Sequence, residues 1–252
     1  MKTRLEADHS VWEADLSRPV DISIPLRAGS HNPTAWYCGP VVIKPVVTEH
    51  FTGDVNLGGS VNFRDIEFNP HGHGTHTECV GHISKEPFTI NQSLTTFFFL
   101  CQVISLPVRQ TENGDQVLLR SDLEALWGVS PRTPAVVIRT LPNDEGKLTR
   151  NYSNTNPPYL EAEIADFLVE NGVDHLLVDL PSVDRESDGG KLDAHHRFWR
   201  YPESTRESAT ITEMIFVPDS VPDGLYLLNL QIASFENDAS PSKPVLYKIT
   251  KV

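Results

Sequence analysis

Runs of apolar residues along the chain predict a protein rich in β-strands. Residues 21–26 and 61–68 alternate between apolar and polar positions at period two, which is the pattern of strands with one buried face. Residues 97–106, 135–141 and 176–180 are almost continuously apolar, as expected of strands that are buried on both faces. Further strands are expected over three other segments, at residues 41–47, 224–233 and 245–249, the last of them at an edge of the sheet.

Two segments between these strands predict helices. Residues 121–126 lie between two apolar runs and begin with Ser121, whose hydroxyl we expect to cap a short helix. Residues 160–168 carry apolar positions at helical spacing, and Gly172 shortly after them is a typical helix stop. The chain is therefore expected to pass from strand to helix to strand twice.

The order of these elements favours a single mixed α/β domain over residues 1–252, with several strands and few helices. No segment rich in proline, glycine and serine divides the chain. Residues 184–208 form a long polar stretch interrupted by a short apolar group, and long loops in compact domains are usually functional or mobile.

Composition and charge indicate which binding partners and which cellular location to expect. The net charge is −13, from 34 acidic and 21 basic residues, which argues against nucleic acid or an anionic membrane as a partner. The three cysteines, Cys38, Cys79 and Cys101, make no even disulfide framework, so a reducing cytoplasm is the expected location. The first eight residues turn polar where a signal peptide would be apolar, and no apolar run approaches a membrane span.

Four of the ten histidines lie within twelve residues, namely His71, His73, His76 and His82, and Glu78 lies among them. Imidazole is the commonest metal ligand in proteins, and a carboxylate supplies the hard oxygen that completes a site for zinc or manganese. On an extended segment His76 and Glu78 share one face and can bind the same ion. The segment therefore predicts a metal site.

The spacing of this cluster, Gly74-Thr75-His76-x-Glu78-x-x-x-His82, resembles the signature of the metal-dependent cyclase family, His-x-Gly-Thr-His-x-Asp-x-Pro-x-His. Glu78 takes the position of the aspartate and Val80 that of the proline. Gly72 stands where the first histidine would be. His71, one residue earlier, is the expected substitute, and His73 is the alternative.

The resemblance extends beyond the cluster, to residues 21–25, to the 179–184 turn, and to the His195-x-x-Phe-Trp segment that is followed by Glu213. It implies that His195 and Glu213 are ligands of a second metal ion, with His196 as the alternative to His195. Asp184, which ends the turn, is interpreted either as a ligand or as the residue that holds the turn.

The resemblance also implies a fold and an activity. The fold would be a β-barrel-like core of mixed strands flanked by helices, of the swivelling β/β/α type, assembled as a homodimer. The activity would be hydrolysis of the amide C–N bond of a small formamide, as in an arylformamidase, or of a cyclic amide. A bound Zn or Mn ion, one or two in number, would activate water, and His82 would be the general acid and base, because histidine titrates near neutral pH.

Several alternatives stay open on the sequence alone. The departures from the signature also suit a catalytically degenerate, metal-containing protein that binds a small molecule, whereas a purely structural metal site would be richer in cysteine. Thr75 is interpreted as orienting a ligand, or as a solvated or cap-forming threonine. Trp36 and Tyr37 are interpreted as the wall of a pocket for an aromatic substrate or as packing on their own domain. Arg64 is interpreted as a partner for a substrate carboxylate or as an ordinary surface arginine.

Overall fold

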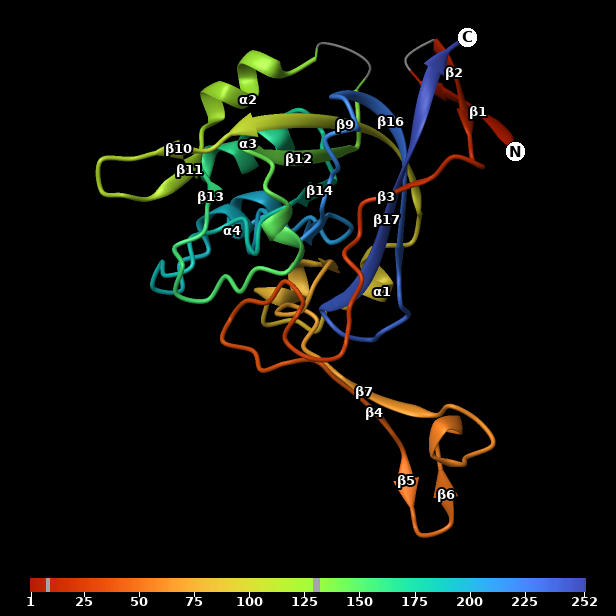
Figure 1. The fold of residues 1–252 in the computed structure, drawn as a ribbon. Coiled ribbons are helices and arrows are strands. Elements are labelled where there is room, and N and C mark those ends of the chain that lie inside the picture. Colours follow the sequence, from red (N-terminus) through yellow and green to blue (C-terminus); the bar gives the residue numbers. More distant parts are fainter. Residues whose placement is uncertain (8–9, 129–131) are drawn as a thin grey trace.

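The computed structural model describes residues 1–7, 10–128 and 132–252, and at its centre is a closed β-barrel of seven strands (Figure 1). The short strand β8 closes the barrel, because it pairs with β15 on one side and with β17 on the other. In order around the barrel the strands are β17 (Ala239–Lys251), β16 (Gly224–Ile232), β9 (Phe98–Pro107), β12 (Ala135–Leu141), β14 (His175–Val178), β15 (Thr210–Glu213) and β8 (His76–Glu78).

Four neighbouring strands of the barrel, β9, β12, β14 and β15, run parallel to one another, and the other pairings are antiparallel. The segments that connect these parallel strands contain the three longer helices, which are α2 (Arg120–Leu126), α3 (Glu163–Glu170) and α4 (Asp193–Trp199). Parallel strands need such crossover connections, and here α3 packs against both α2 and α4. The expected mixed α/β barrel flanked by few helices is confirmed.

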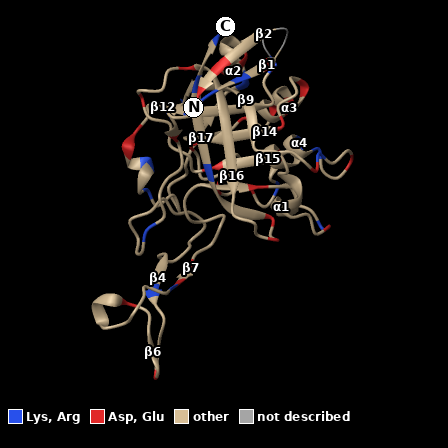
Figure 2. Ribbon diagram, turned by 90° about the vertical axis from the view of Figure 1, so that its right-hand side faces the viewer, with Lys and Arg blue, Asp and Glu red and all other residues tan. Residues whose placement is uncertain are grey.

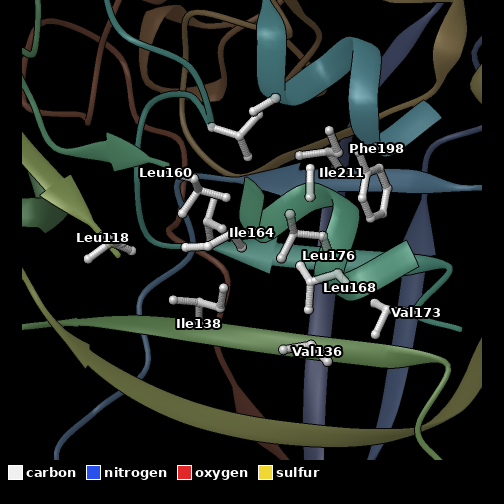
Figure 3. Packing of buried hydrophobic residues seen from close by; sticks show 14 of the residues in the cluster. Leu118, Val136, Ile138, Leu160, Ile164, Leu168, Val173, Leu176, Phe198 and Ile211 are labelled. Carbon is white, nitrogen blue, oxygen red and sulfur yellow. The ribbon is translucent and has the colours of Figure 1, made fainter. Parts of the chain in front are cut away.

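The parallel strands are buried on both faces, which explains their continuous apolar runs. Val136 and Ile138 of β12 pack against the helices (Figure 3), whereas Ala135 and Val137 on the same strand belong to a second cluster inside the barrel. Successive side chains of a strand point to opposite faces, so a strand between two cores needs apolar residues at every position. The strands predicted at residues 97–106, 135–141, 176–180 and 224–233 are all present as β9, β12, β14 and β16.

Shorter elements complete the body of the molecule. An N-terminal hairpin of β1 (Lys2–Ala7) and β2 (Ser10–Asp15) extends the sheet from β17, and β3 (Val20–Asp21) also pairs with β17. A small separate sheet contains β10 (Arg109–Gln110), β11 (Gln116–Leu118) and β13 (Tyr159–Leu160). The remaining helical turns of the body are α1 (Ile90–Ser93), η2 (Val80–His82) and η3 (Glu145–Leu148).

Residues 42–67 form a long hairpin, here called the arm, that projects away from the barrel in both views (Figures 1 and 2). Its elements are β4 (Val42–Pro45), β5 (Val47–Thr48), β6 (Phe51–Thr52), η1 (Val55–Leu57) and β7 (Arg64–Glu67). The extended segment expected at residues 41–47 is thus confirmed. The buried face expected for residues 61–68 is wrong, since all four residues of β7 are exposed and, among the described strands, β7 pairs only with β4.

Three further sequence-based expectations need correction. The strand over residues 245–249 lies within β17, which pairs with four other strands and is therefore not at an edge. Ser121 does not cap α2, because the cap position is Leu119 and Ser121 already lies inside the helix. The polar stretch at residues 184–208 contains α4. Among the residues that the structure describes, no helix is both long enough and apolar enough to span a membrane.

Candidate metal centre

The candidate site lies at the seam where β8 closes the barrel. In the antiparallel register Glu213 of β15 lies opposite His76, and Ala239 of β17 lies opposite Glu78. Directly opposite residues in such a pair have neighbouring side chains. The pairing therefore brings Glu213 to His76, and it places Asp238, which precedes β17, beside Glu78.

His76 is completely buried and presents an unpaired nitrogen. Its Nδ1 lies 3.0 Å from the carbonyl oxygen of Gly74, a contact that requires Nδ1 to donate and leaves Nε2 with a free lone pair. Nε2 has no hydrogen-bond partner among the described residues, and Glu213 Oε2 lies 3.4 Å away. A buried acceptor without a partner is costly, and a cation between the imidazole and the carboxylate would satisfy both groups. This donor pair fits a divalent metal ion.

Glu78 is the buried carboxylate at the centre of the cluster. Its Oε2 lies 3.0 Å from His71 Nδ1, and its Oε1 lies 3.0 Å from His195 Nε2. Burial alone would raise the pKa of Glu78, but the nearby His82, His195 and His71 hold that pKa well below its usual range. Glu78 is therefore an ionised ligand candidate, as the sequence predicts.

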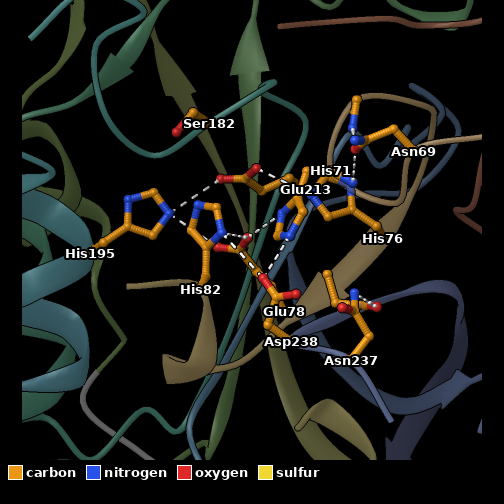
Figure 4. A network of polar contacts seen from close by, with 12 residues as sticks. Asn69, His71, His76, Glu78, His82, Ser182, His195, Glu213, Asn237 and Asp238 are labelled. Atoms are coloured by element: carbon orange, nitrogen blue, oxygen red, sulfur yellow. Dashed lines mark hydrogen bonds and ion pairs between the residues drawn. The ribbon is translucent and has the colours of Figure 1, made fainter. Parts of the chain in front are cut away.

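Asp238 also belongs to the cluster, and sequence reasoning missed it. Its Oδ2 accepts a hydrogen bond from His71 Nε2 at 2.8 Å and lies 3.4 Å from His82 Nδ1 (Figure 4). The hydrogen bonds from His71 and His82 hold the pKa of Asp238 below its ordinary value. Burial lowers the pKa of His71, but its bonds to Asp238 and Glu78 outweigh this and raise the pKa to about 10.

His195 enters the cluster from α4. Asp184 accepts hydrogen bonds from the backbone N–H groups of Ala194 and His195, and its Oδ2 lies 2.6 Å from His195 Nδ1. These contacts direct His195 Nε2 at Glu78 and raise the pKa of His195 to about 10, although burial opposes the rise. Asp184 thus holds the turn and orients His195. His196 points elsewhere, with its Nδ1 3.0 Å from the carbonyl oxygen of Tyr201.

His82 lies at the rim of the cluster. Its side chain is 30% exposed, and its Nδ1 lies 3.9 Å from Glu78 Oε2. Val80, which begins η2, is fully buried in the core at the position where the family signature has proline. Because the first position of a helical turn suits proline, valine can follow the same backbone path.

His71, and not His73, lies in the cluster. His73 Nδ1 accepts a hydrogen bond from the backbone N–H of Asn69 at 2.8 Å, and its Nε2 lies 2.7 Å from the carbonyl oxygen of Gly39. Both ring nitrogens of His73 are therefore engaged in holding a turn. Gly72 lets the chain pass close to Cys38 at this turn, because a Cβ there would overlap the Cys38 thiol unless that side chain moved.

Thr75, the other motif residue, bonds through its hydroxyl to two backbone groups. Its hydroxyl donates to the carbonyl oxygen of Met214 at 2.6 Å and accepts from the backbone N–H of Ile24 at 2.8 Å. Since Met214 directly follows Glu213, this contact fixes the end of β15. The sequence alternative in which Thr75 is a solvated residue is wrong, because its side chain is buried.

The cluster forms one side of a cavity of about 330 Å³. Trp36 lines this cavity, whereas Tyr37 is 69% exposed and bonds through its hydroxyl to Asn154. Arg64 lies on the arm, 3.7 Å from Asp54, and does not line the cavity. Sequence reasoning did not single out Arg185, which does line it.

Three overlapping groups of side chains have ligand atoms that all lie within 4.8 Å of one another. They are His71, His76 and Glu78; His71, His82 and Asp238; and Glu78, His82 and His195. None of these groups in the described part of the chain contains cysteine, so the donors are imidazole and carboxylate. Such a set suits zinc, manganese or a similar divalent ion. Of the residues predicted as ligands, all five lie at this seam.

Comparisons with known proteins identify the family and the fold. The Cyclase family model matches residues 14–185. Kynurenine formamidase from Bacillus cereus (strain ATCC 10987 / NRS 248) is 30% identical over 193 residues, which are 76% of this chain and 82% of that protein. Isatin hydrolase A from Labrenzia aggregata has a similar fold, with a TM-score of 0.65 and 14% identity, over 91% of this chain and 93% of that one. A structure described as a potential metal-dependent hydrolase with cyclase activity gives a TM-score of 0.62 at 16% identity, over 92% of this chain and 98% of that one.

Proposed function

Because this chain belongs to the Cyclase family, we propose that it is a metal-dependent hydrolase that cleaves the amide C–N bond of a small formamide or cyclic amide. The single observation that carries the proposal is the buried Nε2 of His76. It has no hydrogen-bond partner among the described residues and faces Glu213 at the edge of a ligand-sized cavity. The similarity to a kynurenine formamidase supports an N-formyl aromatic amine as the substrate type.

The residues proposed to hold the metal are His71, His76, Glu78, His195 and Glu213, with Asp238 as a further candidate. When bound, a divalent ion supplies Lewis acidity, which makes water more acidic and polarises an amide carbonyl. The donor set suits both zinc and manganese, and we propose that it holds one ion or two.

The protein residues around the cluster would orient the reactants and move the proton. Asp184 fixes His195, and the backbone N–H of Val183 donates to Glu213 Oε1 at 3.0 Å, so the ligand side chains are held before any substrate enters. The departing amine of an amide is a poor leaving group unless it is protonated. His82 lines the cavity and is partly exposed, so it can take up a proton from water and deliver it to the amine nitrogen.

The test is hydrolysis by metal-replete protein of a panel that contains formanilide, isatin and a simple lactone. We expect cleavage of the formamide or the cyclic amide, and loss of that activity on chelation that returns when zinc or manganese is added. Metal-loaded protein that binds these compounds but cleaves none of them would overturn the proposal. That result would favour the alternative of a catalytically degenerate, small-molecule-binding protein.

We further propose that the protein is a homodimer and that the arm is the contacting element. Seven large apolar side chains of the arm are exposed: Val47, Phe51, Val55, Leu57, Val61, Phe63 and Ile66. Monomeric proteins rarely expose apolar patches above a few hundred Å². Two such arms together offer on the order of 1,000 Å² of apolar surface, close to the lower limit of a stable interface. A second copy of the chain supplies the matching surface, because a two-fold contact uses the same patch twice.

A further inference from the structure

Arg185 is the only lysine or arginine among the described residues that line the cavity beside the metal cluster. It directly follows Asp184, the residue that orients His195. Its side chain is 43% exposed, so its charge is accessible to a molecule in the cavity. The other ionisable side chains of the lining are histidines, carboxylates and the thiol of Cys38.

The guanidinium of Arg185 is held in place by a buried partner. Its Nε and Nη2 donate to Asp115 Oδ1 at 3.2 and 2.9 Å, and its Nη1 donates to the carbonyl oxygen of Ser187 at 3.1 Å. Asp115 is itself fixed, because Asn156 and Tyr159 both donate to its carboxylate at 3.2 Å. A guanidinium has five N–H groups, so these three contacts leave two without a partner among the residues that the structure describes.

The neighbouring carboxylates of the lining are already engaged in shaping the loop. Glu186 accepts hydrogen bonds from the backbone N–H groups of Asn154 and Asn156, at 2.5 and 3.2 Å. Asp188 accepts from the backbone N–H groups of Gly190 and Leu192, at 2.7 and 2.6 Å. Glu186 and Asp188 thus hold the loop through its backbone N–H groups, and Arg185 is the one lysine or arginine side chain that the described lining presents.

We propose that Arg185 determines substrate specificity by binding a carboxylate carried by the substrate, away from the amide that is cleaved. This inference rests on the proposed amide hydrolysis and names the substrate class: a formamide or cyclic amide with an anionic group. A planar guanidinium with two free N–H groups matches the two oxygens of a carboxylate, and its fixed orientation lowers the entropy cost of binding.

The test compares formanilide with 2-, 3- and 4-formamidobenzoate, which differ from it only by a carboxylate. We expect wild-type protein to prefer at least one of the formamidobenzoates in kcat/KM. For Arg185→Gln that preference should fall by roughly tenfold to a hundredfold, the range for loss of a hydrogen bond to a charged group, mainly through a higher KM. Arg185→Lys, which keeps the charge but not the planar pair of donors, should be intermediate and covers the case in which Arg185→Gln fails to fold.

Arg109→Gln is the matched control, because Arg109 pairs with Asp122 on the surface and does not line the cavity. This variant should keep the wild-type preference. Equal preference in wild type and Arg185→Gln, or a wild-type preference for formanilide, would overturn the role of Arg185. The proposed function fails if neither a formamide nor a cyclic amide is cleaved. Whenever no formamide is cleaved, calorimetric binding of the same compounds still tests Arg185. Tighter binding of a formamidobenzoate than of formanilide, lost in Arg185→Gln, would then support it, and equal binding would overturn it.

Discussion

Glu213 lies directly opposite His76 in the antiparallel pair of β15 and β8, with its Oε2 3.4 Å from His76 Nε2. The closure of the barrel thereby joins an imidazole from the histidine-rich segment to a carboxylate from a distant part of the chain. Both side chains are buried, and rigid strands hold both of them. A site with donors on barrel strands is prepared for an ion before it binds.

His82→Ala is expected to keep its metal and to lose turnover. His82 is proposed to carry the proton to the departing amine, and general acid–base catalysis typically contributes about 10² to 10⁴ in rate. The measurement is kcat on formanilide together with metal content. An unchanged kcat would remove His82 from the mechanism, and loss of the metal would make it a ligand instead.

Metal binding is expected to release protons and to strengthen as the pH rises. In the metal-free protein the pKa values of His71 and His195 are both raised to about 10, so at pH 7 both imidazoles carry protons that a metal must displace. Metal affinity should therefore increase with pH from 6 to 9, with release of about two protons at pH 7. Calorimetry in buffers of different ionisation enthalpy counts these protons. An affinity that is independent of pH, without proton release, would contradict the ligand assignment.

His175 is expected to make the fold sensitive to acid. Its ring is buried against Phe99, its Nδ1 lies 2.9 Å from Thr210 Oγ1, and burial lowers its pKa from 6.5 to about 4. Because the unfolded chain binds this proton more readily, the stabilising effect is complete above pH 6.5 and is lost as the pH falls to about 4. The loss is about 3 kcal/mol at most.

The measurement is urea unfolding of wild type and His175→Asn at pH 7.5 and pH 4.5. Asparagine keeps a polar atom near the position of Nδ1 and does not titrate. The variant should lose less free energy of unfolding than wild type on acidification. An equal loss in both proteins would show that His175 does not carry the effect.

The arm is expected to hold two chains together. A double substitution of Leu57 and Phe63 by lysine adds charge to the apolar face of the arm, and light scattering should then report a single chain at micromolar concentration. Leu126→Lys is the control, because Leu126 is 51% exposed on α2 and lies outside the arm. It should retain the mass of two chains. A wild-type protein that is itself monomeric, or an arm variant that stays dimeric, would refute the assignment.

The sequence predicts those features of the molecule that depend only on residues close together in the chain. His76 and Glu78 lie two residues apart on a strand and share a face, so their joint action follows from spacing alone. Strands such as β12 can be recognised in the sequence by continuous apolar residues, because both of their faces are buried. These features need no knowledge of distant contacts.

The missed features depend on distant contacts. Asp238 joins the cluster only because β17 pairs with β8, and nothing in the residues around it marks it as a ligand. Residues 61–68 alternate as a half-buried strand would, but Val61, Phe63 and Ile66 lie on the arm and are exposed. The sequence does not predict α4, because its buried face includes the polar residue His195, which interrupts the apolar pattern of a buried helix face.

The metal content of purified protein tests the central claim most directly. Elemental analysis should find zinc or manganese in wild-type protein, and His76→Ala should lose it. His196→Ala is the matched control, since His196 lies on the same helix as His195 but points away from the cluster, and this variant should keep the metal. Full metal retention in His76→Ala would contradict the assignment of the site.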